Sequence, residues 1–158
     1  MIKIANLLTE TRVGCNVDVT SKKRGLEVLS EMLASRGEAL NADAVFNKLV
    51  SREKLGSTGL GKGVALPHAR IEGSETAVAA FVTLNDGIDF DAFDRQPVDM
   101  LFALLVPEHF TDEHLQILAR LAEMFSDTAF CEELRAASTA ADLHHLLTGW
   151  DDDRSPGA

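Results

Sequence analysis

Residues 98–106 read VDMLFALLV, so eight of these nine residues are apolar. A strand with one face in solvent alternates apolar and polar residues, whereas a strand covered on both faces is apolar nearly throughout. The run therefore predicts a central strand that is buried on both faces. Two more strands are predicted before it, at residues 63–66 and 77–84, and the turns Asn85-Asp86-Gly87 and Arg95-Gln96-Pro97 separate the strands.

Helices are predicted on both sides of these strands, because apolar residues recur there with helical spacing. Before the strands, one helix covers about 21–36 and Asn41 caps a second. After them, Thr111 is the expected N-cap of a helix, and two shorter helices follow at 128–137 and 140–147. The helix after Thr111 has an apolar stripe with these predicted members: Leu115, Leu118, Leu121, Ala122 and Phe125.

These elements predict a single α/β domain, in which helices flank both faces of a central mixed β-sheet of about five strands. A chain of 158 residues is long enough to bury one such core. The domain is expected to span residues 1–148. Residues 149–158 offer little to bury, so we expect a mobile C-terminal tail there.

The composition argues against several classes of protein. With a net charge of −10, the chain lacks the excess of Lys and Arg that general DNA or RNA binding needs. No apolar run reaches the ~18 residues of a membrane span, and the first residues lack the pattern of a signal peptide. Cys15 and Cys131 form no CxxC pair. We therefore expect a cytoplasmic protein with reduced, buried thiols, no membrane insertion, no metal site and no cofactor.

Basic residues are concentrated in one part of the chain. Residues 48–70 contain five basic residues and one acidic residue, Glu53, a local charge of +4 in a protein whose net charge is −10. A positive region in an acidic protein predicts a small anionic ligand or group. The competing interpretation is that surface loops gather charge without any ligand.

The stretch 56–68 reads GSTGLGKGVALPH and has an unusual density of glycine. Glycines let backbone amides approach one point closely, which favours anions. Gly56, Gly61 and Lys62 match most of the nucleotide-binding pattern GxxxxGKS/T. However, Gly63 replaces the hydroxyl residue that binds magnesium, and a strand rather than a helix is predicted next. Binding of ATP or GTP is therefore a minor alternative.

His68 is the second candidate in this stretch, and it follows Pro67 at the end of a predicted strand. Ligands commonly bind at strand ends in α/β sheets. The hydroxyls of Ser57 and Thr58 and the cations of the positive region lie within twenty residues of it. A histidine that attacks a phosphoryl group needs in-line positioning and charge stabilisation, which such groups supply. We predict a phosphoryl-accepting histidine, and the alternative is a histidine with a structural role only.

The run 61–69, GKGVALPHA, with Glu53 upstream, resembles the active-site signature of the fructose/mannitol-type enzyme IIA family of the phosphoenolpyruvate-dependent phosphotransferase system. Four further stretches are similar to the nitrogen-regulatory branch of that family, a stand-alone enzyme IIA: residues 21–27, 51–59, 90–99 and 101–107. The resemblance covers about residues 5–148, nearly the whole chain.

The resemblance implies an activity and the residues that carry it. His68 would accept a phosphoryl group on Nε2 from the phosphohistidine of an HPr-like carrier, called NPr in this branch, which an enzyme I homologue charges. His114 matches the second active-site histidine of the family, and Arg52 matches its arginine. A neutral His114 near a helix start could donate a hydrogen bond to a phosphoryl oxygen, and Arg52 could bind phosphate oxygens. The residues alone leave open which nitrogen of His68 reacts.

We expect a cradle of hydroxyls and backbone amides to hold the phosphate beside His68. Its predicted members are Ser57, Thr58, Gly59, Gly61, Lys62 and Gly63. Two positions depart from the family: Lys62 stands where relatives often have an uncharged residue, and Ala69 where many have glycine. Both changes are compatible with the predicted reaction.

Two classes of function follow from this resemblance. In the first, the protein is a phosphotransferase-type phosphocarrier, and its phosphorylation state controls target proteins in nitrogen, carbon and potassium physiology. In the second, it is a regulatory module that binds its targets mainly in the unphosphorylated form. A variant of the first class is the enzyme IIA component of a sugar transporter with separate IIB and IIC partners.

Simpler interpretations compete with some of these assignments. His114 could be an exposed residue in the first turn of its helix, and Arg52 a solvated cation at a helix end. The other histidines are expected to lie at the surface or to pack without a chemical role: His109, His144 and His145. Three phenylalanines are expected mainly in the core, with one or two at a docking face around His68: Phe90, Phe93 and Phe110.

Overall fold

The computed structural model describes residues 3–34, 41–72 and 76–153. In chain order the elements are α1 (Ile4–Leu7), a 3-10 helix (Glu10–Arg12), β1 (Val13–Val17), α2 (Lys22–Ala34), α3 (Ala42–Glu53), β2 (Gly59–Gly61), β3 (Val64–Ala65), β4 (His68–Ile71), β5 (Val78–Ile88), β6 (Val98–Pro107), α4 (Asp112–Ser126), α5 (Thr128–Ala136) and α6 (Ala140–Asp153). The strands form one mixed sheet in the order β1-β5-β6-β3-β2, and β4 also pairs with β6. The predicted α/β fold is confirmed.

β6 lies at the centre of the sheet, as its apolar run predicted. It pairs antiparallel with β5 along one edge and parallel with β3 and β4 along the other. Successive side chains of a strand point to opposite faces, so β6 contributes to two separate cores. One core receives Met100, Phe102, Leu104 and Val106, and the other receives Leu101, Ala103 and Leu105.

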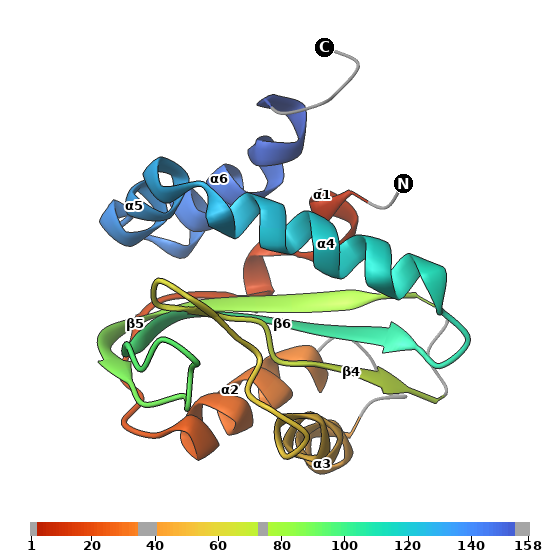
Figure 1. The fold of residues 1–158 in the computed structure, drawn as a ribbon. Coiled ribbons are helices and arrows are strands. Elements are labelled where there is room, and N and C mark those ends of the chain that lie inside the picture. Colours follow the sequence, from red (N-terminus) through yellow and green to blue (C-terminus); the bar gives the residue numbers. More distant parts are fainter. Residues whose placement is uncertain (1–2, 35–40, 73–75, 154–158) are drawn as a thin grey trace.

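A layer of helices covers each face of the sheet (Figure 1). α2 and α3 pack on one face, and α1, α4, α5 and α6 lie on the other. The second layer closes over a cluster of three aromatic rings, in which Phe81 stacks on Phe125 with ring centroids 6.1 Å apart. The helices at both faces were expected from the periodicity on either side of the strands.

Short strands are where the sequence prediction fell short. β1, β2 and β4 were not predicted, and each has five residues or fewer. The turn predicted at Asn85-Asp86-Gly87 is wrong, because β5 continues through these residues to Ile88. Pairing of Ile88 with Val98 of β6 holds this irregular end of the strand in the sheet. These strands depend on pairing with a neighbour, which composition alone does not reveal.

The predicted helix starts agree well with the structure. The Asn41 side chain accepts hydrogen bonds from the amides of Asp43 and Ala44 and thereby caps α3. Thr111 stands at the N-cap of α4, although its side chain makes no capping bond. α2 is described to Ala34, so the last two residues predicted for it lie outside the described part.

Two predictions about the C-terminal helices are wrong. Leu115 is 64% exposed and does not belong to the buried stripe of α4, whose first buried residue is His114. The prediction counted apolar residues only, so it could not place a histidine on the buried face. α6 continues past residue 147 to Asp153, and the buried Trp150 packs against Phe130. The predicted tail therefore begins as a helix, and residues 154–158 lie outside the described part.

The strand pairing brings His68 to a break in the sheet. β3 and β4 pair with successive parts of the same edge of β6, and Leu66 and Pro67 separate them. The Leu104 amide donates to the Pro67 carbonyl across this break. His68 is therefore the first residue of β4 and lies opposite Leu104, not at the end of a strand that stops at Pro67 as predicted. The prediction missed this because proline usually ends a strand.

Candidate functional site

The ring of His68 is oriented by a hydrogen bond to the backbone two residues earlier in the chain. Its Nδ1 lies 2.7 Å from the carbonyl oxygen of Leu66. A carbonyl only accepts hydrogen bonds, so Nδ1 carries the proton in the neutral ring. Nε2 then holds the lone pair, which makes it the nucleophilic atom of the ring. His68 is half-buried, so part of this residue is open to solvent.

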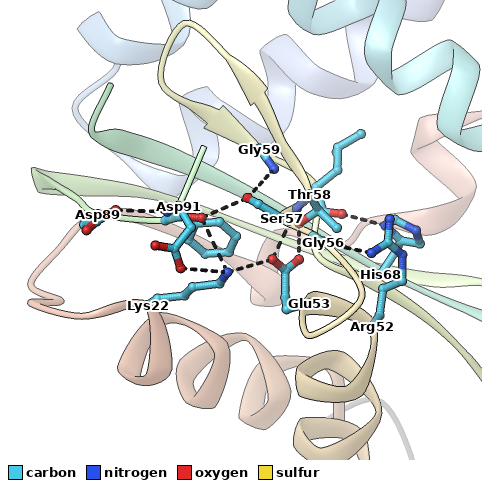
Figure 2. A network of polar contacts seen from close by, with 12 residues as sticks. Lys22, Arg52, Glu53, Gly56, Ser57, Thr58, Gly59, His68, Asp89 and Asp91 are labelled. Carbon is cyan, nitrogen blue, oxygen red and sulfur yellow. Dashed lines mark hydrogen bonds and ion pairs between the residues drawn. The ribbon is translucent and has the colours of Figure 1, made fainter. Parts of the chain in front are cut away.

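A chain of hydrogen bonds supports Leu66 from the end of α3 (Figure 2). The Leu66 amide donates to the Thr58 carbonyl at 3.0 Å. Thr58 in turn donates both its amide and its hydroxyl to the carboxylate of Glu53, and Lys22 pairs with the same carboxylate at 3.0 Å. Glu53 is only 8% exposed, and its two partners supply the hydrogen bonds that a buried carboxylate needs. The orientation of His68 thus depends on a buried, paired carboxylate.

The far end of this network reaches the loop before β6. Lys22 contacts Asp91 at 3.6 Å and lies 4.6 Å from the centre of the Phe90 ring. The Ser57 hydroxyl donates to the Phe90 carbonyl at 2.8 Å and accepts from the amide of Gly59. The hydroxyls of Ser57 and Thr58 therefore hold protein groups together in this structure. Their predicted contact with phosphate stays a prediction.

On the opposite side of His68 lies His114, from the first turn of α4. The two rings meet edge to face, with centroids 5.4 Å apart. His114 is only 7% exposed, which rules out the simpler interpretation as an exposed residue of the first turn. Arg70 Nε lies 3.3 Å from Nδ1 of His114, and Nε2 of His114 is buried without a partner among the described residues. The structure brings together the two histidines that the sequence singled out.

Both histidines are held in the neutral form near pH 7. Burial is the main reason that the pKa of His68 lies below its ordinary value of 6.5, and the charge of Arg52 adds to this effect. The bond to Leu66 and the carboxylate of Glu53 act in the opposite direction. Burial, His68 and Arg70 together lower the pKa of His114 to about 4. A neutral His68 is a nucleophile, and a neutral His114 is a hydrogen-bond donor at one nitrogen.

Arg52 lies in the last turn of α3, where it stabilises the end of the helix. Its guanidinium donates to the Gly56 carbonyl at 2.9 Å. A guanidinium has five N–H groups, so this bond leaves donors for an anion. Figure 2 shows Arg52 and Gly56 beside His68. The positive charge of Arg52 contributes to the lowered pKa of His68.

Arg70 is a residue of this site that the sequence analysis counted only as part of the positive region. It lies two residues after His68 in β4, so both side chains project from the same face of that strand. Its hydrogen bond to His114 connects β4 to α4. The signal that could have identified it is the spacing of two along a strand, but that strand was not predicted.

The turn at Gly61, Lys62 and Gly63 is tied to a different part of the molecule. The Lys62 amide donates to Asp94 at 2.9 Å, and its carbonyl accepts from Arg135 of α5 at 2.7 Å. Gly63 has a φ of +85°, which favours glycine, and a Cβ there would lie 2.6 Å from the same guanidinium. Residues after Lys62 form β3, so the helix that a nucleotide P-loop needs is replaced by a strand. A phosphate-binding role for the turn stays a prediction.

Large apolar side chains are exposed in segments that carry candidate site residues. Leu55 follows α3 and is 83% exposed, and Leu115 follows His114. Phe93 is 79% exposed and lies over Gly61, so it is the one of the three phenylalanines that lies outside the core, as the prediction allowed for one or two of them. Phe90 is fully buried and Phe110 packs partly against the core. Exposed large apolar side chains are typical of a surface that contacts another protein.

Within the described ranges, no helix is long and apolar enough to cross a membrane, and no cluster of three potential metal ligands occurs. Cys131 is buried and Cys15 is only half-buried, and both are free thiols. His144 donates a hydrogen bond from Nε2 to the Leu8 carbonyl at 3.1 Å, in agreement with the packing role expected for it.

Comparisons with known proteins agree with one another. Residues 6–149 match the family described as "Phosphoenolpyruvate-dependent sugar phosphotransferase system, EIIA 2". The chain is 43% identical over 147 residues to a nitrogen regulatory protein of Pseudomonas aeruginosa, which covers 93% of this chain and 96% of that protein. It is 45% identical over 141 residues to a nitrogen regulatory protein of Escherichia coli, with 89% and 83% covered.

Solved structures extend this similarity to the fold. The crystal structure of nitrogen regulatory protein IIA-Ntr from Neisseria meningitidis has a TM-score of 0.87 at 42% identity, covering 92% of this chain and 99% of that one. The IIA mannitol structure from Escherichia coli has a TM-score of 0.73 at 19% identity, covering 89% and 98%. The second similarity concerns the fold alone.

Proposed function

The chain belongs to the EIIA 2 family of the phosphoenolpyruvate-dependent sugar phosphotransferase system, and on that premise we propose that it is a phosphocarrier whose His68 accepts a phosphoryl group on Nε2. The observation that carries the proposal is the 2.7 Å contact between Nδ1 of His68 and the Leu66 carbonyl. That contact fixes the proton on Nδ1 and directs the lone pair of Nε2 away from the backbone.

Transfer requires no proton to be removed from His68. The lone pair of Nε2 forms a bond to phosphorus while the donor's phosphorus–nitrogen bond breaks, and that electron pair returns to the donor nitrogen. Nδ1 keeps its proton and its bond to Leu66 throughout. The lowered pKa of His68 keeps the ring unprotonated and reactive near pH 7.

The groups around His68 suit the negative charge of the phosphoryl group that becomes bonded to the ring. Phosphoryl transfer depends mainly on positioning and on stabilising negative charge. Arg52 supplies a permanent positive charge beside His68, and its planar fork matches phosphate oxygens. His114 Nε2 is a buried donor position on the other side of the ring. A phosphoryl group on His68 would thus have a cation and a neutral donor within its surroundings.

The phosphoryl donor in this proposal is a small phosphocarrier of the NPr type, loaded by an enzyme I homologue in the cytoplasm. Two considerations support it: relatives are called nitrogen regulatory proteins, and large apolar side chains are exposed in segments that carry candidate site residues. The regulated targets belong to the same proposal. Phosphorylation adds negative charge at His68, so it would change which proteins bind there.

A second function, binding of target proteins mainly by the unphosphorylated form, is favoured by the exposure of Leu55 and Phe93. Covering an exposed apolar residue with a partner protein removes apolar surface from water and so favours binding. The negative charge of a phosphoryl group on His68 would oppose such a contact. His68→Ala separates the two functions. This variant loses every effect that depends on phosphoryl acceptance. It stays permanently unphosphorylated, so it should still bind the targets of the unphosphorylated form.

The first experiment is intact mass spectrometry after incubation with phosphoenolpyruvate, the enzyme I homologue and the NPr-like carrier. The wild type should gain ~80 Da, the mass of one phosphoryl group, when acid is avoided. His68→Ala should gain nothing, whereas His145→Ala, which removes an exposed histidine from α6, should behave as the wild type. A gain in His68→Ala, or none in the wild type beside a loaded carrier, would contradict the proposal.

A further inference from the structure

We propose that Arg70 is a positioning residue for phosphoryl transfer: its guanidinium fixes the tautomer of His114, so that Nε2–H of His114 is presented to a phosphoryl group on His68. This inference rests on the proposed function of His68. It adds a residue whose part in the site is visible only in three dimensions.

The tautomer follows from the kind of group that Arg70 offers. A guanidinium carries only hydrogen-bond donors and stays charged in proteins. Arg70 Nε lies 3.3 Å from Nδ1 of His114, so Nδ1 must accept that bond through its lone pair. A neutral imidazole has one proton, and it is therefore on Nε2. The low pKa of His114, about 4, keeps the ring neutral and preserves this assignment.

The second observation is that the proton on Nε2 of His114 has no hydrogen-bond acceptor within the described part of the protein. Nε2 of His114 is buried and has no hydrogen-bond partner there. Leaving a buried donor unpaired destabilises the folded state, so such groups are rare unless a bound group pairs with them. The His114 ring stands at 79° to the ring of His68, with centroids 5.4 Å apart. An oxygen of a phosphoryl group on His68 could accept a hydrogen bond from Nε2–H of His114.

The fold explains how Arg70 comes to act on His114. His68 and Arg70 are separated by one residue of β4, and alternate residues of a strand share a face. Pairing of His68 with Leu104 and of Arg70 with Val106 fixes both positions against the central strand. His114 approaches the same face from the first turn of α4. One short strand therefore positions the acceptor histidine and the residue that orients its neighbour.

The first test needs no phosphoryl transfer. Long-range ¹H–¹⁵N NMR spectra of the unphosphorylated protein report which nitrogen of each histidine carries the proton. We expect His114 to be protonated on Nε2 in the wild type, and Arg70→Met to populate the Nδ1–H form. Arg70→Lys keeps a charged donor and should retain the wild-type form. Arg24→Gln, which removes an exposed arginine of α2, should leave the spectrum of His114 unchanged.

The second test measures transfer from the loaded carrier. Arg70→Met should lower kcat about tenfold, the size of one hydrogen bond to a charged group, with little change in KM for the carrier. A role limited to docking would raise KM instead. The inference is overturned if wild-type His114 carries its proton on Nδ1, or if Arg70→Met slows transfer without changing the tautomer. Absence of transfer in the wild type would overturn the proposed function, but the tautomer measurement would still stand.

Discussion

The two sides of His68 differ in how completely their buried polar groups are paired. Toward α3, the carboxylate of Glu53 is bonded by Thr58 and Lys22. Toward α4, Nε2 of His114 is buried with no partner in the described part of the chain. Buried polar groups are almost always paired, and a bound acceptor would complete the unpaired nitrogen of His114. The first side holds the histidine in place, and the second is suited to receive the group that the histidine accepts.

The largest effect is expected from breaking the paired side. Glu53→Ala removes the acceptor of two buried donors of Thr58 and the partner of Lys22. The free energy of unfolding should fall by about 3 kcal/mol, as measured by urea denaturation. Glu31→Ala is the matched control, because this exposed carboxylate pairs with Arg24 only at 3.9 Å. It should cost less than about 1 kcal/mol.

A Glu53→Ala variant as stable as the control would contradict the comparison. It would mean that the network beside α3 contributes nothing to the folded state. The orientation of His68 would then have to depend on β4 alone.

The second prediction concerns pH and the unpaired side. The pKa of His114 is about 4 in the folded protein and 6.5 in an unfolded chain, so the unfolded state takes up a proton first as the pH falls. The contribution of neutral His114 to the free energy of unfolding is therefore present above pH 6.5 and is lost as the pH falls below that value. From pH 7.5 to pH 5 the contribution of His114 should fall by about 2 kcal/mol.

Comparison of the wild type with His114→Leu isolates this contribution, because other groups titrate in both proteins. His114→Leu should be about as stable as the wild type at pH 7.5, since it removes a buried donor that has no partner among the described residues. The difference between the two proteins should grow in favour of the variant as the pH falls to 5. Parallel stability curves would show that His114 titrates normally.

The smallest effect is expected in the middle of the network. Thr58→Val removes the hydroxyl bond to Glu53 but keeps the amide bond and the shape of the side chain. Unfolding free energy should fall by about 1 kcal/mol, and Thr58→Ser, which keeps the hydroxyl, should recover most of the loss. The NMR signals of the His68 ring should move in Thr58→Val, because Thr58 supports Leu66. Unmoved signals would break the proposed connection between Glu53 and His68.

Much of the fold could be predicted from the sequence because its largest elements have strong local patterns. The run 98–106 identified the central strand, and helical spacing with the Asn41 cap identified the helices. β4 escaped prediction because it is four residues long and follows a proline. It exists through its pairing with β6, which is a tertiary interaction.

The site could be predicted only where it lies in a recognisable motif. His68, His114 and Arg52 were named from the sequence, and the structure brings His68 beside both of the others. Arg70 was missed because its importance depends on the strand that was missed. The network from Lys22 to Thr58 joins α2 to the end of α3, and no local pattern indicates that contact.

The central claim is that Nε2 of His68 carries the phosphoryl group. The most direct test is to phosphorylate ¹⁵N-histidine-labelled protein with the loaded carrier and record long-range ¹H–¹⁵N and ³¹P spectra above pH 7. We predict phosphorus bonded to Nε2 of His68, with Nδ1 still protonated and bonded to the Leu66 carbonyl. Phosphorus on Nδ1 of His68, or on any other histidine, would contradict it.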